Sequence, residues 1–462
     1  MQIDHEIQPA GLRKKLQDLW ELSAEKIKLI RKEYDTSQGS PVFTRNGKYT
    51  TMGWTEWTQG FQFGGELLQF DATDEKEFLE LGRKATLELM APHITHVGVH
   101  DHGFNNISTY GALRRLCSEG RIESCEWERS FYDLAIKSSG AVQAVRWTRT
   151  AEGGGFVYSF NGPHSLFVDT IRSMRALAAA HRLGHALFTE NDVRVSLLER
   201  MIMHIDSTAR YSVYYGEGRD TWDICGRTVH EAIFNVNDGR FRCPSSQQGF
   251  SPFTTWTRGL AWAVCGFAEQ LEFLDILGDR ELEPMGGRQH LENIMLRAAR
   301  ATSDFYIANT SADGIPYWDT GAPLLYRLGD YTSVKSDPFN EYEPVDSSAA
   351  AIAGQGLLRL GRYLEKRGQE EDGGRYFRAG LTVAETLLGD PYISRDRGHQ
   401  GLLLHSVYHR PNGWDNIPAG MKIPCGESSM WGDYHLRELA LYLWRIINNG
   451  PYYTFFGGIE KN

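Results

Sequence analysis

The sequence predicts an all-α protein whose helices form a closed double ring. Along several stretches, apolar residues recur at intervals of three and four, which is the period of a helix. Small or apolar residues also cover other sides of these stretches, so the helices must be buried on more than one face. Strand signals are few and short. Six helical hairpins of roughly 75 residues each would make one domain of the 462-residue chain.

Helical stretches follow one another along the chain. We expect a single domain over residues 1–462, with a helix within residues 1–40 leading into the ring. Further helices are expected at 110–117, 168–184, 346–366 and 431–447, and a short strand is expected at 230–238. Asp346 has the position of an N-cap. Another helix begins near Trp256, and its apolar stripe consists of Leu260, Val264, Phe267, Leu271 and Leu274.

Composition excludes some classes of partner. The net charge of −10 disfavours nucleic acid or an anionic membrane, although a cleft with its own local charge could bind a small anion. Aromatic residues make up 12% of the chain, which suits either stacking surfaces for sugars or a large helical core. The first twenty residues have no apolar signal region, and no apolar run is long enough to span a membrane, so we expect a cytoplasmic protein. The six cysteines form no C-x-x-C pair and are expected to be reduced.

The motif VHDHGF (99–104) places Asp101 between His100 and His102. With His93 and His96 upstream, the cluster could suggest zinc, but its spacing does not match the H-E-x-x-H pattern of a zinc-binding helix. We therefore expect no metal, and histidines that are solvated or packed in the core. Asp101, which precedes a glycine by two residues, is either a turn residue or a functional carboxylate.

A second carboxylate, Asp169, stands immediately before an expected helix in FVDTIRSM (167–174). One interpretation is an N-cap, which would lower its pKa through the helix dipole. The other is a general acid, which needs a raised pKa from burial or from a neighbouring carboxylate. The sequence leaves both interpretations open.

Aromatic residues gather where several helices begin. Trp57 lies in WTEWTQGF (54–61), Trp256 and Trp262 flank Arg258 in TTWTRGLAW (254–262), and Trp431 lies in SSMWGDY (428–434). Taken singly, such a residue is typical of a hydrophobic staple. In a closed ring, alternate helices start on the same rim, so these side chains would surround one cavity. An apolar cavity crossed by a few polar groups is what a sugar pocket requires.

These motifs, in this order, resemble the unsaturated glucuronyl hydrolases, glycoside hydrolase family 88. The resemblance runs from about Val42 to Trp444 and is carried by WTQGF, HDHGF, VDTIRSM, HEAIFNVNDG, QGF…TTWTRGLAW, YWD, DSSAAAIA, YHR and MWGDY. It implies an (α/α)6 barrel without a metal or organic cofactor. It also implies removal of an unsaturated uronic acid from the non-reducing end of oligosaccharides made by polysaccharide lyases.

The resemblance also implies a mechanism and roles for particular residues. Such enzymes hydrate the C4=C5 vinyl ether instead of attacking the anomeric carbon. Asp169 corresponds to the acid/base, and Asp101 to a second carboxylate that would raise the proton affinity of Asp169 by like-charge repulsion. Arg258 is expected to pair with the uronate carboxylate and the indoles to stack on its ring. The expected substrate-binding residues are His230, Gln248, Trp256, Arg258, Trp262, Trp57, His100, Tyr408 and Trp431.

The chain departs from the family pattern at several positions, which leaves the substrate open. Gln247 stands where His is frequent, and Gln59 and Gln62 stand where Asp and an aromatic residue are frequent. Phe160 is the candidate for a pocket aromatic residue in the segment 125–166, and Lys422 could meet a sulfate or be a solvated loop lysine.

Three alternatives remain at this point. An unsaturated rhamnogalacturonyl hydrolase would have the same barrel and chemistry. A barrel sugar epimerase would rely on histidine bases, and the sequence does not show their arrangement. A sugar-binding protein without catalysis would not need both aspartates. The oligomeric state is not predicted.

Overall fold

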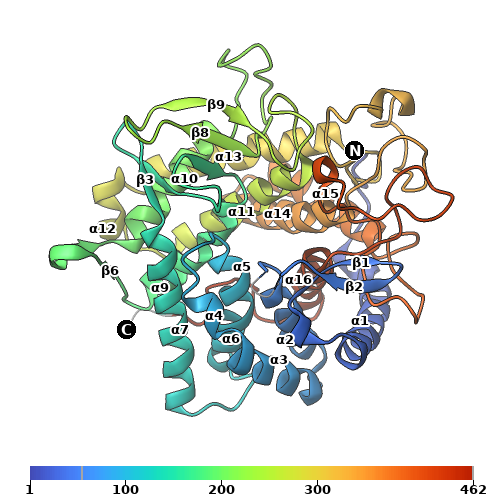
Figure 1. Ribbon diagram of the computed structural model, residues 1–462, viewed down its shortest axis with the longest axis horizontal. Helices are drawn as coiled ribbons and strands as arrows, with labels where there is room; N and C mark the ends of the chain where they lie inside the picture. Colours follow the sequence, from blue (N-terminus) through green and yellow to red (C-terminus); the bar gives the residue numbers. More distant parts are fainter. Residues whose placement is uncertain (54–55, 460–462) are drawn as a thin grey trace.

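Six inner helical segments lie side by side and close into a ring, as the periodicity predicts. The computed structural model describes residues 1–53 and 56–459, and within these residues each inner segment packs against the next. In Figure 1 the dark-red α16 lies beside the blue α2, which closes the ring. The inner segments are α2 (Gln59–Thr73), the run α5 (His102–Asn106), η3 (Ile107–Gly111) and α6 (Ala112–Ser118), the pair α8 (Thr170–Ser173) and α9 (Arg175–Arg182), α11 (Thr257–Asp275), α14 (Ser347–Glu365) and α16 (Met430–Ile447).

Outer helices cover the ring and complete an (α/α)6 barrel, the predicted fold class. α3 packs on α2, α7 on α5 and α9, α10 on α9, α13 on α11, and α15 on α14, while α1 contacts both α2 and α16. α1 lies within residues 1–40, where a leading helix is expected. The outer helices are α1 (Arg13–Glu33), α3 (Lys76–Leu89), α7 (Glu126–Val145), α10 (Leu197–Tyr211), α13 (Arg288–Asn309) and α15 (Glu370–Leu387).

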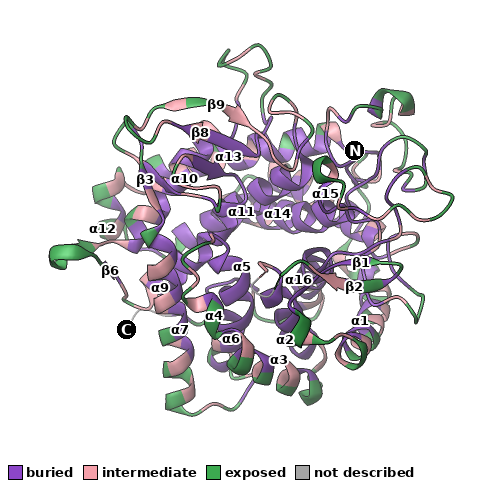
Figure 2. Ribbon diagram, viewed as in Figure 1, coloured by how far each residue is buried: buried purple, intermediate pink, exposed green. Residues whose placement is uncertain are grey.

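The inner helices are buried on all sides, which explains their small and apolar residues. Every residue from Thr257 to Leu274 of α11 is buried. In Figure 2 α11 and α14 are purple along most of their length, whereas α7 carries pink and green residues. Contact between α11 and α14 requires Gly356, because a Cβ there would lie 2.6 Å from the Cα of Cys265. The helix predicted to begin near Trp256 is therefore a central wall of the barrel.

Short strands and single helical turns connect the helices. The strands are β1 (Pro41–Arg45), β2 (Lys48–Thr51), β3 (Trp147–Arg149), β4 (Gly155–Val157), β5 (Ser165–Phe167), β6 (Leu187–Phe188), β7 (Arg194–Val195), β8 (Glu231–Phe234) and β9 (Phe241–Ser245). The turns are α4 (Ala91–Ile94), α12 (Asp279–Leu282), η1 (Pro9–Leu12), η2 (Thr36–Gln38), η4 (Glu190–Asp192), η5 (Glu283–Met285), η6 (Leu325–Leu328) and η7 (Arg410–Asn412). Among the described residues, no helix is long and apolar enough to cross a membrane.

One small sheet positions two residues of the candidate site. β5, β8 and β9 pair antiparallel, and Phe167 of β5 lies opposite Glu231 of β8. Just beyond this pair, the Val168 N–H donates to the His230 carbonyl at 3.0 Å. The pairing therefore brings His230, immediately before β8, close to Asp169, two residues after β5.

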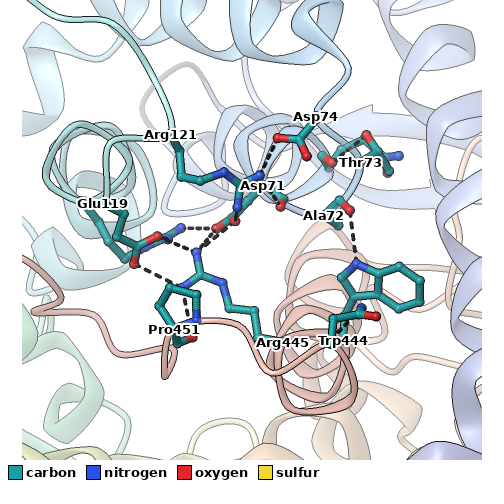
Figure 3. A network of polar contacts seen from close by, with 12 residues as sticks. Asp71, Ala72, Thr73, Asp74, Glu119, Arg121, Trp444, Arg445 and Pro451 are labelled. Atoms are coloured by element: carbon teal, nitrogen blue, oxygen red, sulfur yellow. Dashed lines mark hydrogen bonds and ion pairs between the residues drawn. The ribbon is translucent and has the colours of Figure 1, made fainter.

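The C-terminal ends of α2, α6 and α16 meet in a buried ionic network. In Figure 3 Arg121 and Arg445 approach the Asp71 carboxylate from opposite sides. Arg445 Nη2 lies 2.8 Å from both Asp71 oxygens, Arg121 Nη1 lies 3.0 Å from Oδ1, and Arg115 Nη2 lies 2.6 Å from Oδ2. Burial would raise the pKa of Asp71, but Arg115 and Arg445 lower it below the ordinary value. The carboxylate thus links three helices at the end of the barrel where the inner helices finish.

Replacement of Asp71 by Asn should destabilise the fold strongly. The change leaves Arg115 and Arg445 buried with Glu119 as their remaining shared carboxylate, and breaking a buried ion pair costs about 3–5 kcal/mol. Urea unfolding should report a loss of this size in the free energy of unfolding. Asp74→Asn is the matched control, because Asp74 pairs with Arg121 at 2.6 Å but its side chain is 77% exposed. The control should lose less than about 1 kcal/mol, and equal losses would contradict the role given to Asp71.

Candidate active site

A cavity of about 530 Å³ opens at the end of the barrel where the inner helices begin. Its walls come from the residues that precede or start α2, α5, α8 and α11, and from the loop before α16. Nine predicted site residues line it: Trp57, His100, Asp101, Asp169, Gln248, Trp256, Arg258, Trp262 and Tyr408. The other lining residues are Gly53, Glu56, His96, Val99, Phe104, Phe160, Phe167, Gln247, His409, Asn412 and Trp414.

Two predicted residues, His230 and Trp431, lie behind the cavity wall. The His230 ring contacts Phe167 and Trp256, with ring centroids 4.3 and 4.7 Å apart. Trp431 is fully buried and stacks on Trp57, with ring centroids 5.1 Å apart. Both residues support the lining side chains from behind.

Asp101 and Asp169 each stand immediately before an inner helix, yet neither carboxylate caps its helix among the described residues. The N-cap interpretation of Asp169 is therefore wrong for its side chain, although its position is that of an N-cap. Both carboxyl groups line the cavity and both residues are 8% exposed. They are thus free to act on a ligand in the cavity.

His100 lies between the two carboxylates. Its Nε2 lies 3.3 Å from Asp169 Oδ1 and 3.7 Å from Asp101 Oδ1. The Phe160 backbone N–H donates to Nδ1 at 3.2 Å, so Nδ1 is an acceptor and the neutral ring carries its proton on Nε2. Ser173 Oγ and Gln143 Nε2 donate to the His100 carbonyl at 2.5 and 2.8 Å. Nε2 therefore lies near both carboxylates, while Asp169 Oδ1 has no hydrogen-bond partner among the described residues.

The environment moves the two carboxyl pKa values apart. For Asp101, burial and the neighbouring Asp169 raise the pKa, and His100 offsets only part of this rise. Burial would also raise the pKa of Asp169, but His100, then His230 and Arg258, lower it below the ordinary value. The sequence-based expectation places the raised pKa on Asp169, whereas in the free protein the pKa of Asp101 is the one that is raised. His100 Nε2 lies closer to Asp169 than to Asp101, and the Arg258 charge also acts on Asp169, so Asp101 is the better proton holder of the pair.

His230 is neutral and has a fixed tautomer. Burial lowers its pKa to about 4, and its Nδ1 accepts from the backbone N–H groups of Gln247 and Gln248 at 3.0 and 3.3 Å. The ring proton therefore lies on Nε2, which has no hydrogen-bond partner among the described residues. This buried donor lies behind the cavity wall, near Asp169.

Arg258 is 1% exposed and is held by four protein acceptors. Its Nη1 donates to Asp346 Oδ2 at 3.0 Å and to the Val407 carbonyl, and its Nη2 donates to Gln248 Oε1 and the Tyr408 carbonyl, both at 2.8 Å. These bonds use all four hydrogens of the two terminal nitrogens. The guanidinium also lies over the rings of Trp256 and Trp431, at 4.7 and 4.9 Å from the centroids. The expected direct pair with a substrate carboxylate thus competes with these contacts.

Sequence reasoning missed the loop that carries His409, Asn412 and Trp414 into the cavity wall. Asp415 organises this loop, because its carboxylate accepts from the N–H groups of Tyr408 and His409 at 2.5 and 3.2 Å. The signal in the sequence was the histidine of the YHR motif itself and a tryptophan in the proline- and glycine-containing loop that follows it. Glu56 and Gln247 were also missed as lining residues.

Two further candidates can be placed. Phe160 lines the cavity, is 57% exposed and stacks against His100 with ring centroids 6.1 Å apart. Lys422 is exposed, pairs with Glu341 at 2.8 Å and is not among the described lining residues.

The histidine cluster is divided among separate hydrogen bonds. His93 Nε2 lies 2.7 Å from Gln59 Oε1, and His102 contacts Ser139 Oγ through Nδ1 and the His96 carbonyl through Nε2, at 3.0 and 3.1 Å. Burial lowers the pKa of both His93 and His102 to about 4. Within residues 1–53 and 56–459 no group of three or more His, Cys, Asp or Glu side chains is arranged to hold a metal ion.

Comparisons with known proteins point in one direction. No family model matches the chain. An unsaturated glucuronyl hydrolase of Bacillus sp. (strain GL1) is 24% identical over 408 residues, which cover 87% of this chain and 89% of that protein. An unsaturated chondroitin disaccharide hydrolase of Streptococcus agalactiae is 21% identical over 410 residues, covering 87% and 85%.

Solved structures agree on the fold. The crystal structure of the unsaturated glucuronyl hydrolase from Bacillus sp. GL1 superimposes with a TM-score of 0.70 at 20% identity, and the match covers 97% of this chain and 99% of that one. A crystal structure of an unsaturated glucuronyl hydrolase specific for heparin gives a TM-score of 0.70 at 18% identity, covering 94% and 98%. The chain is therefore similar in sequence to the unsaturated glucuronyl hydrolases over most of its length and has their fold, as its motifs predict.

Proposed function

We propose that this protein is an unsaturated glucuronyl hydrolase, which removes a 4-deoxy-4,5-unsaturated uronic acid from the non-reducing end of an oligosaccharide. The observation that carries the proposal is the Asp101–His100–Asp169 cluster in the cavity wall. The aromatic lining supplies flat surfaces for the unsaturated ring. The cavity also lies at the start of the inner helices, where the helix dipoles favour an anionic ligand.

The proposed reaction is hydration of the C4=C5 vinyl ether. A carboxyl group protonates C4, and a water molecule, which loses a proton to a carboxylate, adds its oxygen to C5. The resulting hemiketal opens and expels the remaining sugar as an alcohol. Each proton that is transferred to carbon is replaced by one from water, so the carboxyl pair is regenerated.

Asp169 is assigned as the group that transfers protons to and from the substrate, and Asp101 as the group that stores a proton. The raised pKa of Asp101 in the free protein supports its role as the proton store, whereas Asp169, whose pKa is lowered there, needs the bound substrate to reach the proton affinity of a general acid. An anionic uronate beside Asp169 would raise the pKa of Asp169, because like charges disfavour ionisation. The pair then titrates as one unit with macroscopic pKa values.

The substrate is proposed from its relatives. One matched protein is named for chondroitin disaccharides, one structure for heparin, and one structure holds the oligosaccharide dGlcA-Glc-Rha-Glc. Lyase-generated disaccharides of these classes, with rhamnogalacturonan fragments to test the alternative family, should be assayed by loss of the ultraviolet absorbance of the conjugated double bond. The cytoplasmic location stays a prediction.

Asp169→Asn should keep the fold and lower turnover by about 10²–10⁴-fold, the usual effect of losing a positioned acid/base group. The rate of turnover of unsaturated disaccharides measures the loss of activity, and the melting temperature Tm checks that the fold is kept. Asp35→Asn is the control, because Asp35 also precedes a helix, where it accepts from Ser37 N–H, but lies outside the cavity. Near-normal turnover of Asp169→Asn would remove it from the mechanism.

Asp101→Asn should lower activity and shift the pH dependence of what remains. In the free protein burial and Asp169 raise the pKa of Asp101, so the pair keeps its proton to a higher pH than an ordinary aspartate does. The variant retains only Asp169, whose pKa is lowered, so its kcat/KM should begin to fall at a lower pH than in the wild type. A pH–rate profile checks this, and an unchanged descending limb would show that the two carboxylates do not share a proton.

Chelation should leave activity intact, because the proposed chemistry needs only carboxyl groups and water. Protein dialysed against a strong chelator should turn over the same disaccharide at an unchanged rate. Inactivation that added zinc reverses would contradict the mechanism.

A further inference from the structure

Arg146 is a buried cation at the end of α7. It is the C-cap residue of that helix and is 5% exposed. Its guanidinium donates to three backbone carbonyls and, among the described residues, pairs with no carboxylate. Burial lowers its pKa below the ordinary value, and Tyr158 and Asp101 offset only part of this fall. The partial negative charge at a helix C-terminus favours a cation, but that effect does not require the planar guanidinium of an arginine.

The planar guanidinium joins two segments of the chain. Nε donates to the Tyr158 carbonyl at 3.1 Å, Nη2 donates to the Ser159 carbonyl at 2.5 Å, and Nη1 donates to the Val97 carbonyl. The guanidinium also lies over the Tyr158 ring, 4.3 Å from its centroid. A planar fork of donors can bind three carbonyls at once, whereas a lysine ammonium is a compact point charge. Arg146 thus ties the loop of residues 158–165 to the segment before α5.

The 158–165 loop in turn contacts the ring of His100. The Phe160 N–H donates to His100 Nδ1 at 3.2 Å, and the two rings stack with an angle of 19° between their planes. Because a backbone N–H can only donate, Nδ1 carries no proton and the ring proton lies on Nε2. The other end of the loop is anchored by Glu231, whose Oε1 accepts from Ser165 Oγ at 2.5 Å.

The segment before α5 carries His100 itself. Val97, whose carbonyl accepts from Arg146, lies three residues before His100. The His100 carbonyl accepts from Gln143 Nε2, which also belongs to α7, at 2.8 Å. The end of α7 therefore holds both the backbone of His100 and, through the 158–165 loop, the donor to its ring. Release of the loop would separate that donor from Nδ1.

We propose that Arg146 is a positioning residue for His100, which it controls through the 158–165 loop. By clamping that loop, it holds the Phe160 N–H against Nδ1 and keeps the ring proton on Nε2, near the two carboxylates of the site. The consequence for catalysis rests on the proposed function: a proton moved to Nδ1 would leave a lone pair on Nε2 facing the two carboxylates. Arg146 is not among the described residues that line the cavity, so it acts without touching a ligand.

The protonation of the His100 ring is a readout that does not depend on turnover. NMR of protein labelled in its histidine ring nitrogens distinguishes protonated from unprotonated nitrogens, and His100→Gln identifies the His100 signals by their loss. Nδ1 should be unprotonated in the wild type. In Arg146→Met, which has no donors, the share of molecules with a proton on Nδ1 should rise by about 5- to 10-fold, as expected for a lost hydrogen bond. An unchanged Nδ1 signal in the folded variant would overturn the proposal.

The matched control is Arg200→Met. Arg200 is also an arginine whose pKa is lowered by burial, and it donates to the carbonyl of Ala144, near the same end of α7. Its guanidinium lies over the Trp147 ring, 4.9 Å from the centroid, and it does not line the cavity. The control should leave the Nδ1 signal and kcat near their wild-type values. An effect equal to that of Arg146→Met would reflect a general loosening of the helix end and would overturn the positioning role.

Arg146→Lys separates the fork from the charge and covers the case in which Arg146→Met does not fold. Arg146→Met should lower kcat for an unsaturated uronoside by about 10- to 100-fold, the effect of a small misplacement of a reacting group. KM should change little, because Arg146 touches no substrate. Arg146→Lys should recover only part of kcat and of the Nδ1 signal, since it keeps the charge without the planar fork. Full recovery by lysine, or a change in KM alone, would overturn the clamp.

Two substitutions of Phe160 test the link between the loop and the ring. Phe160→Pro and Phe160→Ala both remove the aromatic ring, but only proline also removes the N–H. Phe160→Pro should raise the protonation of Nδ1 as Arg146→Met does, and Phe160→Ala should not. An equal change in the two variants would assign the effect to the aromatic ring and overturn the proposal.

The NMR readout also separates this proposal from the proposed function. If the wild type turns over no unsaturated uronoside, the proposed function fails. The Nδ1 signals of the Arg146 and Phe160 variants still decide the positioning role: a gain of protons on Nδ1 supports it, and unchanged signals overturn it.

Discussion

The structure depends on the parallel direction of its inner helices. Because each inner helix is followed by an outer helix that returns along the outside, every inner helix starts at the same end of the barrel. Residues that immediately precede these helices, far apart in the chain, are therefore collected around one cavity. The partial positive charges of several helix N-termini point to the same space, which favours a carboxylate ligand there. The site is thus a consequence of how the ring closes.

Buried charges are distributed along the barrel in matched groups. Asp71 binds its arginines where the inner helices end, and the Arg258–Asp346 pair lies at the cavity end. Between these ends Arg172, which is fully buried, pairs with Glu269 at 2.9 Å and with Glu438 at 2.6 Å. Burial would raise the pKa of both glutamates, but Arg172 lowers it. Such pairs are costly to break singly, because the remaining charge would stay buried without its partner.

The candidate site shows how local charge overrides position in the chain. A helix start would lower the pKa of both Asp101 and Asp169, yet only that of Asp169 is lowered. The difference comes from the partners of each carboxylate, since His100 lies closer to Asp169. The same principle applies to Arg258. Its positive charge can attract an anionic ligand, but its terminal N–H groups already donate to protein acceptors.

The sequence by itself determined the helical class, the positions of the main inner helices and nine of the twenty residues that line the cavity. The apolar periodicity and the small residues indicate directly which helix faces are buried. The motifs before the helices identify Asp101, Asp169 and the indoles as candidate site residues. Only the tertiary structure decided that Trp431 and His230 stand behind the wall, that Asp101 holds a proton better than Asp169, and that Arg258 is held by Asp346. These facts depend on distances between segments remote in the chain, and neither helical period nor motif order encodes such distances.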